Sequence, residues 1–246
     1  MSSNAERTAE GRGRLGNRLS GAAVALGLVL FLGGFVWGAV LYQPYTVPTD
    51  SMDPTVKAGS RVLAERVDGA RIRRGDVVVF QDGVWGSVPM VKRVVGVGGD
   101  KVACCDARGR LTVNGKSVEE PYLRDGAQDS ERAFETTTVP EGKLFLLGDN
   151  RQASLDSRTH LEDRDHGAVP RSAVKGRVDA VAWPVDGLGM LPEAPGFAAM
   201  PGGTSEHGPL PLALGAVVVG AVLVLGGAAY GPLARRRAMS ARRSAG

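Results

Sequence analysis

One serine and one lysine in this chain stand in segments where they could act together as nucleophile and base. Ser51 lies in the segment 47–55, VPTDSMDPT, and Lys92 lies in the apolar run 90–95, MVKRVV. A serine hydroxyl is a weak nucleophile until a neighbouring base removes its proton. A lysine can do so when burial in an apolar site lowers the pKa of its amine from about 10.4. The two segments therefore allow a serine hydrolase whose base is a lysine, although composition alone does not favour it over the alternatives below.

Two other interpretations compete with this one. Histidine is the usual base for a serine, and the chain has only His160, His166 and His207. His207 lies in a stretch rich in Gly and Pro, whereas the other two lie in the charged stretch 159–166, which we read as a solvated loop. A hydrolase with His160 or His166 as base is one alternative. The other is that Lys92 projects from an edge strand, where lysine discourages aggregation.

A third polar segment follows the apolar run 143–147. It is LGDNRQASLDSR, residues 147–158, and its side chains could bond one another. Taken alone, its Gly-Asp-Asn sequence is a good turn, and Asp156 with Arg158 is an ordinary ion pair at strand spacing. The order of the three segments along the chain is more informative than any one of them.

Cys104 and Cys105 are the only cysteines, and they are adjacent. Because a disulfide between neighbours closes a strained ring, we expect free or lightly oxidised thiols. Two thiols with no histidine nearby in sequence do not make a tetrahedral metal site. We therefore expect neither a metal nor a cofactor.

Short apolar segments separated by turn signals are typical of β-strands, and the chain has several. They are residues 61–64, 76–80, 90–95, 111–113, 143–147 and 178–183. Asn114-Gly115 predicts a hairpin between 111–113 and 117–118. We predict a mostly β catalytic domain, built of antiparallel coiled sheets or a partly open barrel, with a small hairpin subdomain at about 100–140.

Two uncharged apolar runs, 21–41 and 210–233, are each long enough to cross the ~30 Å hydrocarbon core of a bilayer as a helix. A cleaved signal peptide is the alternative for the first run, which exceeds the usual ~7–15 apolar residues of such a peptide. Arginines precede the first run and follow the second, which places both termini in the cytoplasm. The predicted organisation is a cytoplasmic tail (1–19), a transmembrane helix (20–42), an extracytoplasmic domain (43–186), a Gly/Pro-rich linker (187–209), a second transmembrane helix (210–233) and a basic cytoplasmic tail (234–246).

The formal net charge of +4 and the pI of about 9.3 come largely from these two basic tails. Membrane orientation explains them better than nucleic-acid binding does. We expect the lipid bilayer as a partner, no nucleic acid, and a monomer.

In order and spacing, the segments resemble bacterial type I signal peptidases, also called leader peptidases. The matching stretches are SMDPT (51–55), GDVVVF (75–80), VKRVVGVGGDKV (91–102), GDNR (148–151) and SLDSR (154–158). The resemblance covers most of residues 43–183 and the first apolar run. The second apolar run resembles only some members, and the coding bias toward Ala, Gly and Arg is actinobacterial-like.

The resemblance implies a membrane-bound serine endopeptidase that removes signal peptides from exported preproteins and cuts after small residues. Ser51 would be the nucleophile and Lys92 the general base. Ser154 would hold the lysine amine, and Asp156 would pair with Arg158. Asp149 would be a second partner of that arginine. Thr49 would supply a hydroxyl to the oxyanion hole beside the Ser51 N–H.

The resemblance also assigns substrate-binding residues, for which core packing is the alternative. These are Tyr45, Val47, Met52, Met90 and Val91. If residues 45–51 run extended, an unfolded peptide could pair with their edge as an added strand.

The chain departs from many relatives at two positions near the serine. Thr49 replaces a serine, and Asp50 replaces a glycine. Because a carboxylate close to Lys92 would raise the lysine pKa, we expect Asp50 to point outward.

A membrane-anchored β module that binds secreted partners without catalysis is the alternative from another functional class. It would leave the Ser51 and Lys92 segments unexplained.

Overall fold

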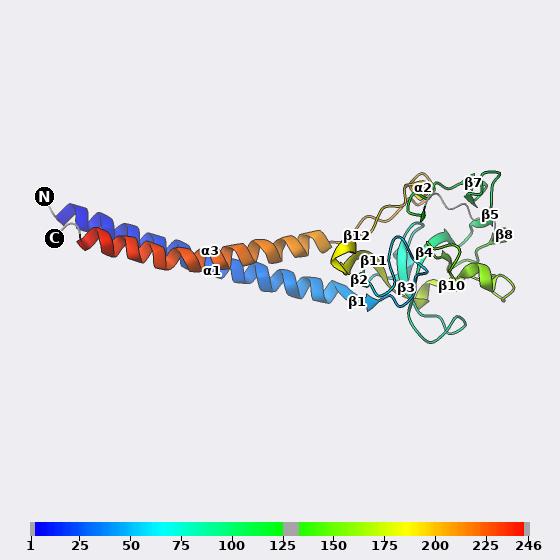
Figure 1. Ribbon diagram of the computed structural model, residues 1–246, viewed down its shortest axis with the longest axis horizontal. Coiled ribbons are helices and arrows are strands. Elements are labelled where there is room, and N and C mark those ends of the chain that lie inside the picture. Colours follow the sequence, from blue (N-terminus) through cyan, green and yellow to red (C-terminus); the bar gives the residue numbers. More distant parts are fainter. Residues whose placement is uncertain (1–2, 125–132, 244–246) are drawn as a thin grey trace. The chain divides into compact units, whose positions relative to one another are not determined.

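The computed structural model describes residues 3–124 and 133–243, with side chains described for residues 16–124 and 133–232. The chain forms two compact units, one of Met1–Val40 with Pro209–Gly246 and the other of Leu41–Gly208. The first contains two long helices and the second contains the strands (Figure 1). Parts of the predicted tails, 1–2 and 244–246, and part of the predicted hairpin subdomain, 125–132, lie outside the described residues.

The two long helices are α1 (Ser3–Leu41) and α3 (Leu210–Arg243). Their segments Gly16–Leu41 and Leu210–Pro232 are long and apolar enough to cross a membrane. These bounds agree within a few residues with the predicted spans 20–42 and 210–233.

Small residues bring α1 and α3 into close contact along a seam. A Cβ placed on Gly27 would lie 2.8 Å from the Gly220 carbonyl oxygen, and one on Gly34 would lie 2.9 Å from that of Ala213. Ser20 Oγ donates to the carbonyl oxygen of Gly227 at 2.7 Å. The seam residues recur every seven positions on both helices, namely Ser20, Gly27 and Gly34 on α1 and Ala213, Gly220 and Gly227 on α3. Small residues allow two apolar backbones to approach this closely.

The second unit is built on an antiparallel sheet of eight strands with the order β1-β2-β11-β3-β4-β9-β10, and β12 pairs with β11. The strands are β1 (Tyr42–Thr46), β2 (Arg61–Glu65), β3 (Val77–Phe80), β4 (Met90–Val97), β9 (Lys143–Leu147), β10 (Val169–Pro170), β11 (Val174–Trp183) and β12 (Gly189–Met190). Strands β1 and β10 lie at the ends of this order, so β4 is an interior strand. The prediction of a mostly β, antiparallel, partly open fold is confirmed.

A four-stranded sheet with the order β7-β6-β5-β8 forms the small subdomain. Its strands are β5 (Lys101–Cys104), β6 (Leu111–Val113), β7 (Lys116–Ser117) and β8 (Phe134–Thr138). Asn114 and Gly115 have φ of 54° and 74°, which are the left-handed values that a tight hairpin turn requires. The predicted hairpin is therefore confirmed. One apolar cluster, including Val113 of β6 and Phe145 of β9, joins the two sheets.

Short helices complete the second unit between the strands. They are η1 (Gly69–Arg71), η4 (Ser157–His160), η5 (Arg171–Ala173), η6 (Val185–Gly187) and α2 (Pro195–Ala198).

The segment predicted as a linker, 187–209, is folded onto the sheet up to Gly208. Phe197 is fully buried in the cluster that joins the two sheets, and Leu191 is buried in a second cluster. Ser205 Oγ donates to Asp76 Oδ2 at 2.8 Å. The prediction of a linker was wrong because the few apolar residues among the prolines and glycines fill gaps in the core.

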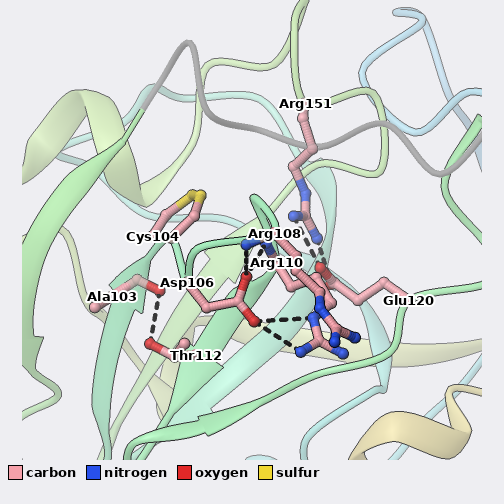
Figure 2. The surroundings of a disulfide bond; sticks show 9 residues. Ala103, Cys104, Asp106, Arg108, Arg110, Thr112, Glu120 and Arg151 are labelled. Atoms are coloured by element: carbon pink, nitrogen blue, oxygen red, sulfur yellow. Dashed lines mark hydrogen bonds and ion pairs between the residues drawn. A yellow bond between two sulfur atoms is a disulfide. The ribbon is translucent and has the colours of Figure 1, made fainter.

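The structure joins Cys104 and Cys105 in a disulfide (Figure 2), in place of the expected free or lightly oxidised thiols. Cys104 is buried in the cluster that joins the sheets, and Cys105 packs against the same cluster. Among the described residues no cluster of His, Cys, Asp or Glu could hold a metal ion.

Candidate active site

Ser51 lies in the turns that follow β1, where the chain leaves the edge of the large sheet. Its side chain is buried, and its carbonyl oxygen accepts from the Asn150 N–H at 3.0 Å. The Asn150 side-chain amide donates to the Asp50 carbonyl oxygen at 3.2 Å. Thr49 Oγ1 donates to Ser51 Oγ at 3.2 Å. The loop after β9 thus fixes the backbone of Ser51, and the neighbouring threonine contacts its hydroxyl.

Lys92 lies in the interior strand β4, and its side chain reaches the Ser51 hydroxyl. Its Nζ donates to Ser51 Oγ at 2.8 Å and to the Val91 carbonyl oxygen at 3.2 Å. Only 4% of Lys92 is exposed. The structure therefore excludes the alternative of a surface lysine on an edge strand.

Burial lowers the pKa of Lys92 from its usual value to about 8. Two nearby carboxylates act against this change, because the charges of Asp156 and Asp149 raise the pKa of the lysine. A pKa near 8 leaves part of the amine neutral at pH 7 and more of it at higher pH. The neutral amine has the lone pair that a base needs.

Gly148 forms the wall of the site between Ser51 and Ser154. A Cβ at this position would lie 2.4 Å from the Ser51 carbonyl oxygen and 2.2 Å from Ser154 Oγ. Both distances are far below any real contact of a Cβ atom, so only glycine fits here. The sequence placed Gly148 in a turn and did not show this close approach.

Asp156 and Arg158 form the ion pair that the sequence predicts. Arg158 Nε and Nη2 each lie 2.8 Å from a carboxylate oxygen of Asp156. Asp156 also accepts from the Gly148 N–H at 3.0 Å. Burial acts to raise the pKa of Asp156, but the Arg158 hydrogen bond and charge, the Gly148 N–H and the Ser154 hydroxyl outweigh it and lower that pKa. Asp156 is therefore a carboxylate at neutral pH.

Ser154 is buried beside this carboxylate, and its hydroxyl helps to lower the pKa of Asp156. Gly148 separates it from the Ser51 backbone. Its role toward the Lys92 amine stays a prediction.

Asp149 pairs with a different arginine from the one that the sequence predicts. Its two carboxylate oxygens accept from Nε and Nη2 of Arg93 at 2.8 and 2.7 Å, and Thr55 Oγ1 donates to it at 2.6 Å. Arg93 is paired with Leu147 across β4 and β9, so it lies next to the start of the loop that carries Asp149. Arg158 is instead bound to Asp156 and to the Arg151 carbonyl oxygen.

Asp50 and the two candidate histidines are placed as the lysine interpretation requires. Asp50 is exposed, so the expectation that it points outward is confirmed. His160 stacks on Trp85 with ring centroids 4.7 Å apart, and His166 Nδ1 contacts the Leu161 carbonyl oxygen at 3.3 Å. The hydroxyl of Ser51 is bound by Lys92 and Thr49 instead.

Four of the five predicted substrate-binding residues pack together next to the serine loop. Val47, Met52 and Val91 are buried in one cluster, and Tyr45 packs against it. Met90 packs against a different cluster, which contains Phe80 and Val94. The role of all five in binding a peptide stays a prediction.

Several residues of the site carried no assigned role in the sequence. They are Gly148, Arg93, Arg151, Thr55, Glu120 and Tyr122. An arginine beside Lys92 in an apolar run was a visible signal for Arg93, because a buried charge requires a partner. The partners of the others come from distant parts of the chain, which a single sequence does not reveal.

Comparison with known proteins agrees with this geometry. The model of the family described as "Signal peptidase, peptidase S26" matches residues 19–183. A signal peptidase I of Bacillus licheniformis is 38% identical over 155 residues, which cover 59% of this chain and 79% of that protein. A signal peptidase IB of Staphylococcus aureus is 35% identical over 173 residues, which cover 63% of this chain and 85% of that protein.

A mycobacterial relative and a solved structure extend the comparison. A protein of Mycobacterium leprae named "Probable signal peptidase I" is 32% identical over 220 residues, covering 66% of this chain and 74% of that protein. A crystal structure of a signal peptidase I from Enterococcus faecalis, 28% identical, covers 43% of this chain and 94% of that chain with a TM-score of 0.33. That score is too low to support an argument about the fold. Because the family model matches well over half of the chain and Bacillus and Staphylococcus enzymes are matched over most of their length, this chain belongs to the signal peptidase family, peptidase S26.

Proposed function

We propose that this protein removes signal peptides from exported preproteins, with Ser51 as the nucleophile and Lys92 as the general base. The observation that carries the proposal is the 2.8 Å contact between Lys92 Nζ and Ser51 Oγ in a buried site that lowers the pKa of the lysine to about 8. A neutral amine at this distance accepts the hydroxyl proton as the oxygen attacks a carbonyl carbon.

The reaction follows from these positions in two stages. Ser51 Oγ bonds to the carbonyl carbon of the peptide bond, and Lys92 takes its proton. Lys92 then gives this proton to the leaving amine, which frees the mature protein and leaves the signal peptide as an ester on Ser51. A water molecule, deprotonated by Lys92, cleaves the ester and restores the hydroxyl. The Ser51 N–H and the Thr49 hydroxyl stabilise the oxyanion in both stages, and each such donor contributes roughly 10²-fold or more.

Asp156 and Arg158 keep the site in shape around this pair. The Asp156 carboxylate binds the Gly148 N–H, and the buried Ser154 hydroxyl lies close enough to lower the Asp156 pKa, which supports a role for Ser154 in holding the Lys92 amine in line. Desolvation remains the larger influence on Lys92, so the amine still loses its proton near pH 8.

The substrate binds as an extended peptide next to β1. This strand is at the end of the sheet order, so one of its edges has no strand partner among the described residues. The strand ends at Thr46, and Val47 is tied to Ser60 and Gly59, so the extended stretch is shorter than 45–51. Tyr45, Val47, Met52 and Val91 provide small apolar pockets, which favour alanine-like side chains before the cut.

Two membrane spans anchor the enzyme, with both termini in the cytoplasm and the catalytic unit outside. The candidate spans and the arginine-rich flanks support this topology. Ser51 follows Leu41, the last residue of the first span, by ten residues, which keeps the site close to the outer surface of the membrane. We propose that the enzyme acts there as a monomer.

Cleavage of a purified preprotein by the detergent-solubilised enzyme tests the proposal. The new amino terminus is sequenced for the wild type and for Ser51→Ala, Lys92→Ala, His160→Ala and His166→Ala. We expect a cut after a small residue that is lost in the first two variants and kept in the two histidine variants. Full activity in Ser51→Ala or Lys92→Ala would overturn the proposed roles, and a wild type without activity would favour a binding module.

A further inference from the structure

A carboxylate from the small subdomain reaches the loop that forms the wall of the active site. Glu120 follows β7, and its two carboxylate oxygens accept from Nη2 and Nη1 of Arg151 at 2.5 and 3.1 Å. Figure 2 shows the carboxylate and the guanidinium facing each other. The side chains of Arg151 and Glu120 are only 2% and 6% exposed. Buried pairs with two parallel hydrogen bonds are rigid, and loss of one partner leaves an uncompensated buried charge.

Arg151 in turn holds the wall of the active site. Its Nε donates to the Gly148 carbonyl oxygen at 3.0 Å, and its own carbonyl oxygen accepts from Arg158 Nη2 at 2.8 Å. The N–H of Gly148 is bound to Asp156. Gly148 is therefore hydrogen-bonded through both its N–H and its carbonyl oxygen, and it lies against the Ser51 carbonyl oxygen. A shift of Arg151 would therefore displace Gly148, and with it the backbone of Ser51.

A second contact from the same segment reaches the arginine beside Lys92. The Tyr122 hydroxyl donates to Glu120 Oε1 at 2.5 Å, and its ring lies under the Arg93 guanidinium, 3.7 Å from the ring centroid to Cζ. Arg93 pairs with Asp149 in the wall loop. Residues 120–122 thus support both arginines that hold the loop after β9.

We propose that Glu120 is a positioning residue for cleavage, which acts through Arg151 on Gly148 and so on the alignment of Ser51 with Lys92. This inference rests on the proposed function of that pair. Glu120 does not touch the reacting atoms. The small subdomain is then part of the machinery that aligns the site, although all of the catalytic groups lie outside it.

The chain offers a matched control one residue away. Glu119 is also a glutamate paired with an arginine, Arg110, but its side chain is 71% exposed and its partner belongs to the small subdomain. The variants Glu120→Gln and Glu119→Gln make the same chemical change at the two positions. Both are prepared as full-length protein in detergent, and cleavage kinetics are measured together with thermal unfolding.

We expect Glu120→Gln to lower kcat by about 10- to 100-fold while KM changes by less than about twofold, because misalignment of about 1 Å costs up to about 10²-fold. Glu119→Gln should keep kcat within about twofold of the wild type. If Glu120→Gln does not fold, Glu120→Asp is measured instead. It keeps the carboxylate on a side chain that is one methylene shorter, and it should lower kcat by less than the loss expected for Glu120→Gln.

A double variant separates positioning through Arg151 from a general structural role. If Glu120 acts through Arg151, Glu120→Gln with Arg151→Gln should have the same kcat as Arg151→Gln alone, since coupled residues are not additive. Multiplied losses would show that Glu120 acts by another route. An unchanged kcat in folded Glu120→Gln would show that the pair only joins the subdomain to the sheet. Activity in Ser51→Ala would instead contradict the proposed function itself.

Discussion

At the scale of single residues, two opposing influences set the pKa of Lys92. Burial favours the neutral amine, whereas the charges of Asp156 and Asp149 favour the ammonium. Burial is the larger influence, and the pKa falls to about 8. The carboxylates thus keep the lysine basic enough to accept a proton from serine while burial leaves part of it neutral.

This balance predicts the pH dependence of cleavage. kcat/KM should rise with pH and level off above about 8, because the ammonium form of Lys92 cannot accept a proton. Replacement of Asp156 by asparagine removes a charge that raises the pKa of Lys92, so the rise should move to lower pH. Asp50 is exposed and is not among the groups that shift Lys92, so Asp50→Asn is the control and should leave the profile in place. A profile of Asp156→Asn shifted to higher pH would contradict this account of the electrostatics.

Gly148 gives a second prediction at this scale. Gly148→Ala should lower kcat by about 10- to 100-fold, because its methyl group would displace the Ser51 carbonyl oxygen and the Ser154 hydroxyl. Gly83→Ala is the control, since a Cβ there meets nothing within 4 Å. Steady-state kinetics of the two variants compare the positions, and equal activities would show that the wall tolerates movement.

The sequence predicted that Ser51 and Lys92 lie together, as they do, but it did not predict all of the contacts around them. Ser51, Lys92, Asp156 and Arg158 lie in short ordered segments, so their types and spacing were informative. The partner of Asp149 was predicted incorrectly, because its contact with Arg93 depends on the register of β4 against β9. A register between strands that are 50 residues apart is not visible in one sequence.

At the scale of elements, the two long helices depend on small residues in their seam. Gly220→Leu should separate α1 from α3, because a Cβ on Gly220 would already lie 2.5 Å from the Phe31 nitrogen. The contact between α1 and α3 is measured in a protein that carries both Ser20→Cys and Gly227→Cys, through the disulfide that forms between the two new cysteines. Its yield, measured by mass spectrometry, should fall sharply with Gly220→Leu. Gly226→Leu is the matched control, as a Cβ there meets nothing within 4 Å, and an equal fall in both variants would contradict the seam.

The segment after β11 gives a prediction for the catalytic unit. Phe197→Ala should lower the free energy of unfolding by about 3–5 kcal/mol, because it empties a fully buried site between the sheets. Leu188→Ala in the same segment should change it by less than about 0.5 kcal/mol, since Leu188 is 62% exposed. Denaturant unfolding in detergent, followed by tryptophan fluorescence, compares them. Equal stabilities would mean that the segment behaves as the linker the sequence suggested.

The elements that the sequence predicted correctly are those with dense apolar runs. Segments 111–113 and 143–147 match β6 and β9, and the other predicted strands differ only at their ends, most of all β11, which begins at Val174. Strands β1, β5, β8, β10 and β12 were not among the predicted segments; FETTT of β8 is largely polar, and β10 and β12 have only two residues each. For β8 and β12, pairing with β5 and β11 determines the strand more than its own composition does.

At the scale of the whole molecule, this signal peptidase joins a pair of apolar helices to a sheet that carries its active site. In the proposed topology, the ten residues from Leu41 to Ser51 would keep the site near the membrane, where the cleavage site of a translocated preprotein would emerge. The proposed two anchors, one at each end of the catalytic unit, would restrict its distance from the bilayer more than one anchor would. The hydropathy of the sequence already predicted the two apolar helices, whereas the alignment of Ser51 with Lys92 needed the folded sheet.

The central claim is that Ser51 attacks the peptide bond with Lys92 as its base. The most direct measurement mixes enzyme in excess with a preprotein, stops the reaction with acid within milliseconds to seconds, and maps covalent adducts by mass spectrometry. We predict a signal peptide attached as an ester to Ser51 in the wild type and in His160→Ala. No such adduct should form within the same time in Ser51→Ala or Lys92→Ala. Cleavage with an adduct on another residue, or an adduct that forms at the wild-type rate in Lys92→Ala, would contradict the account.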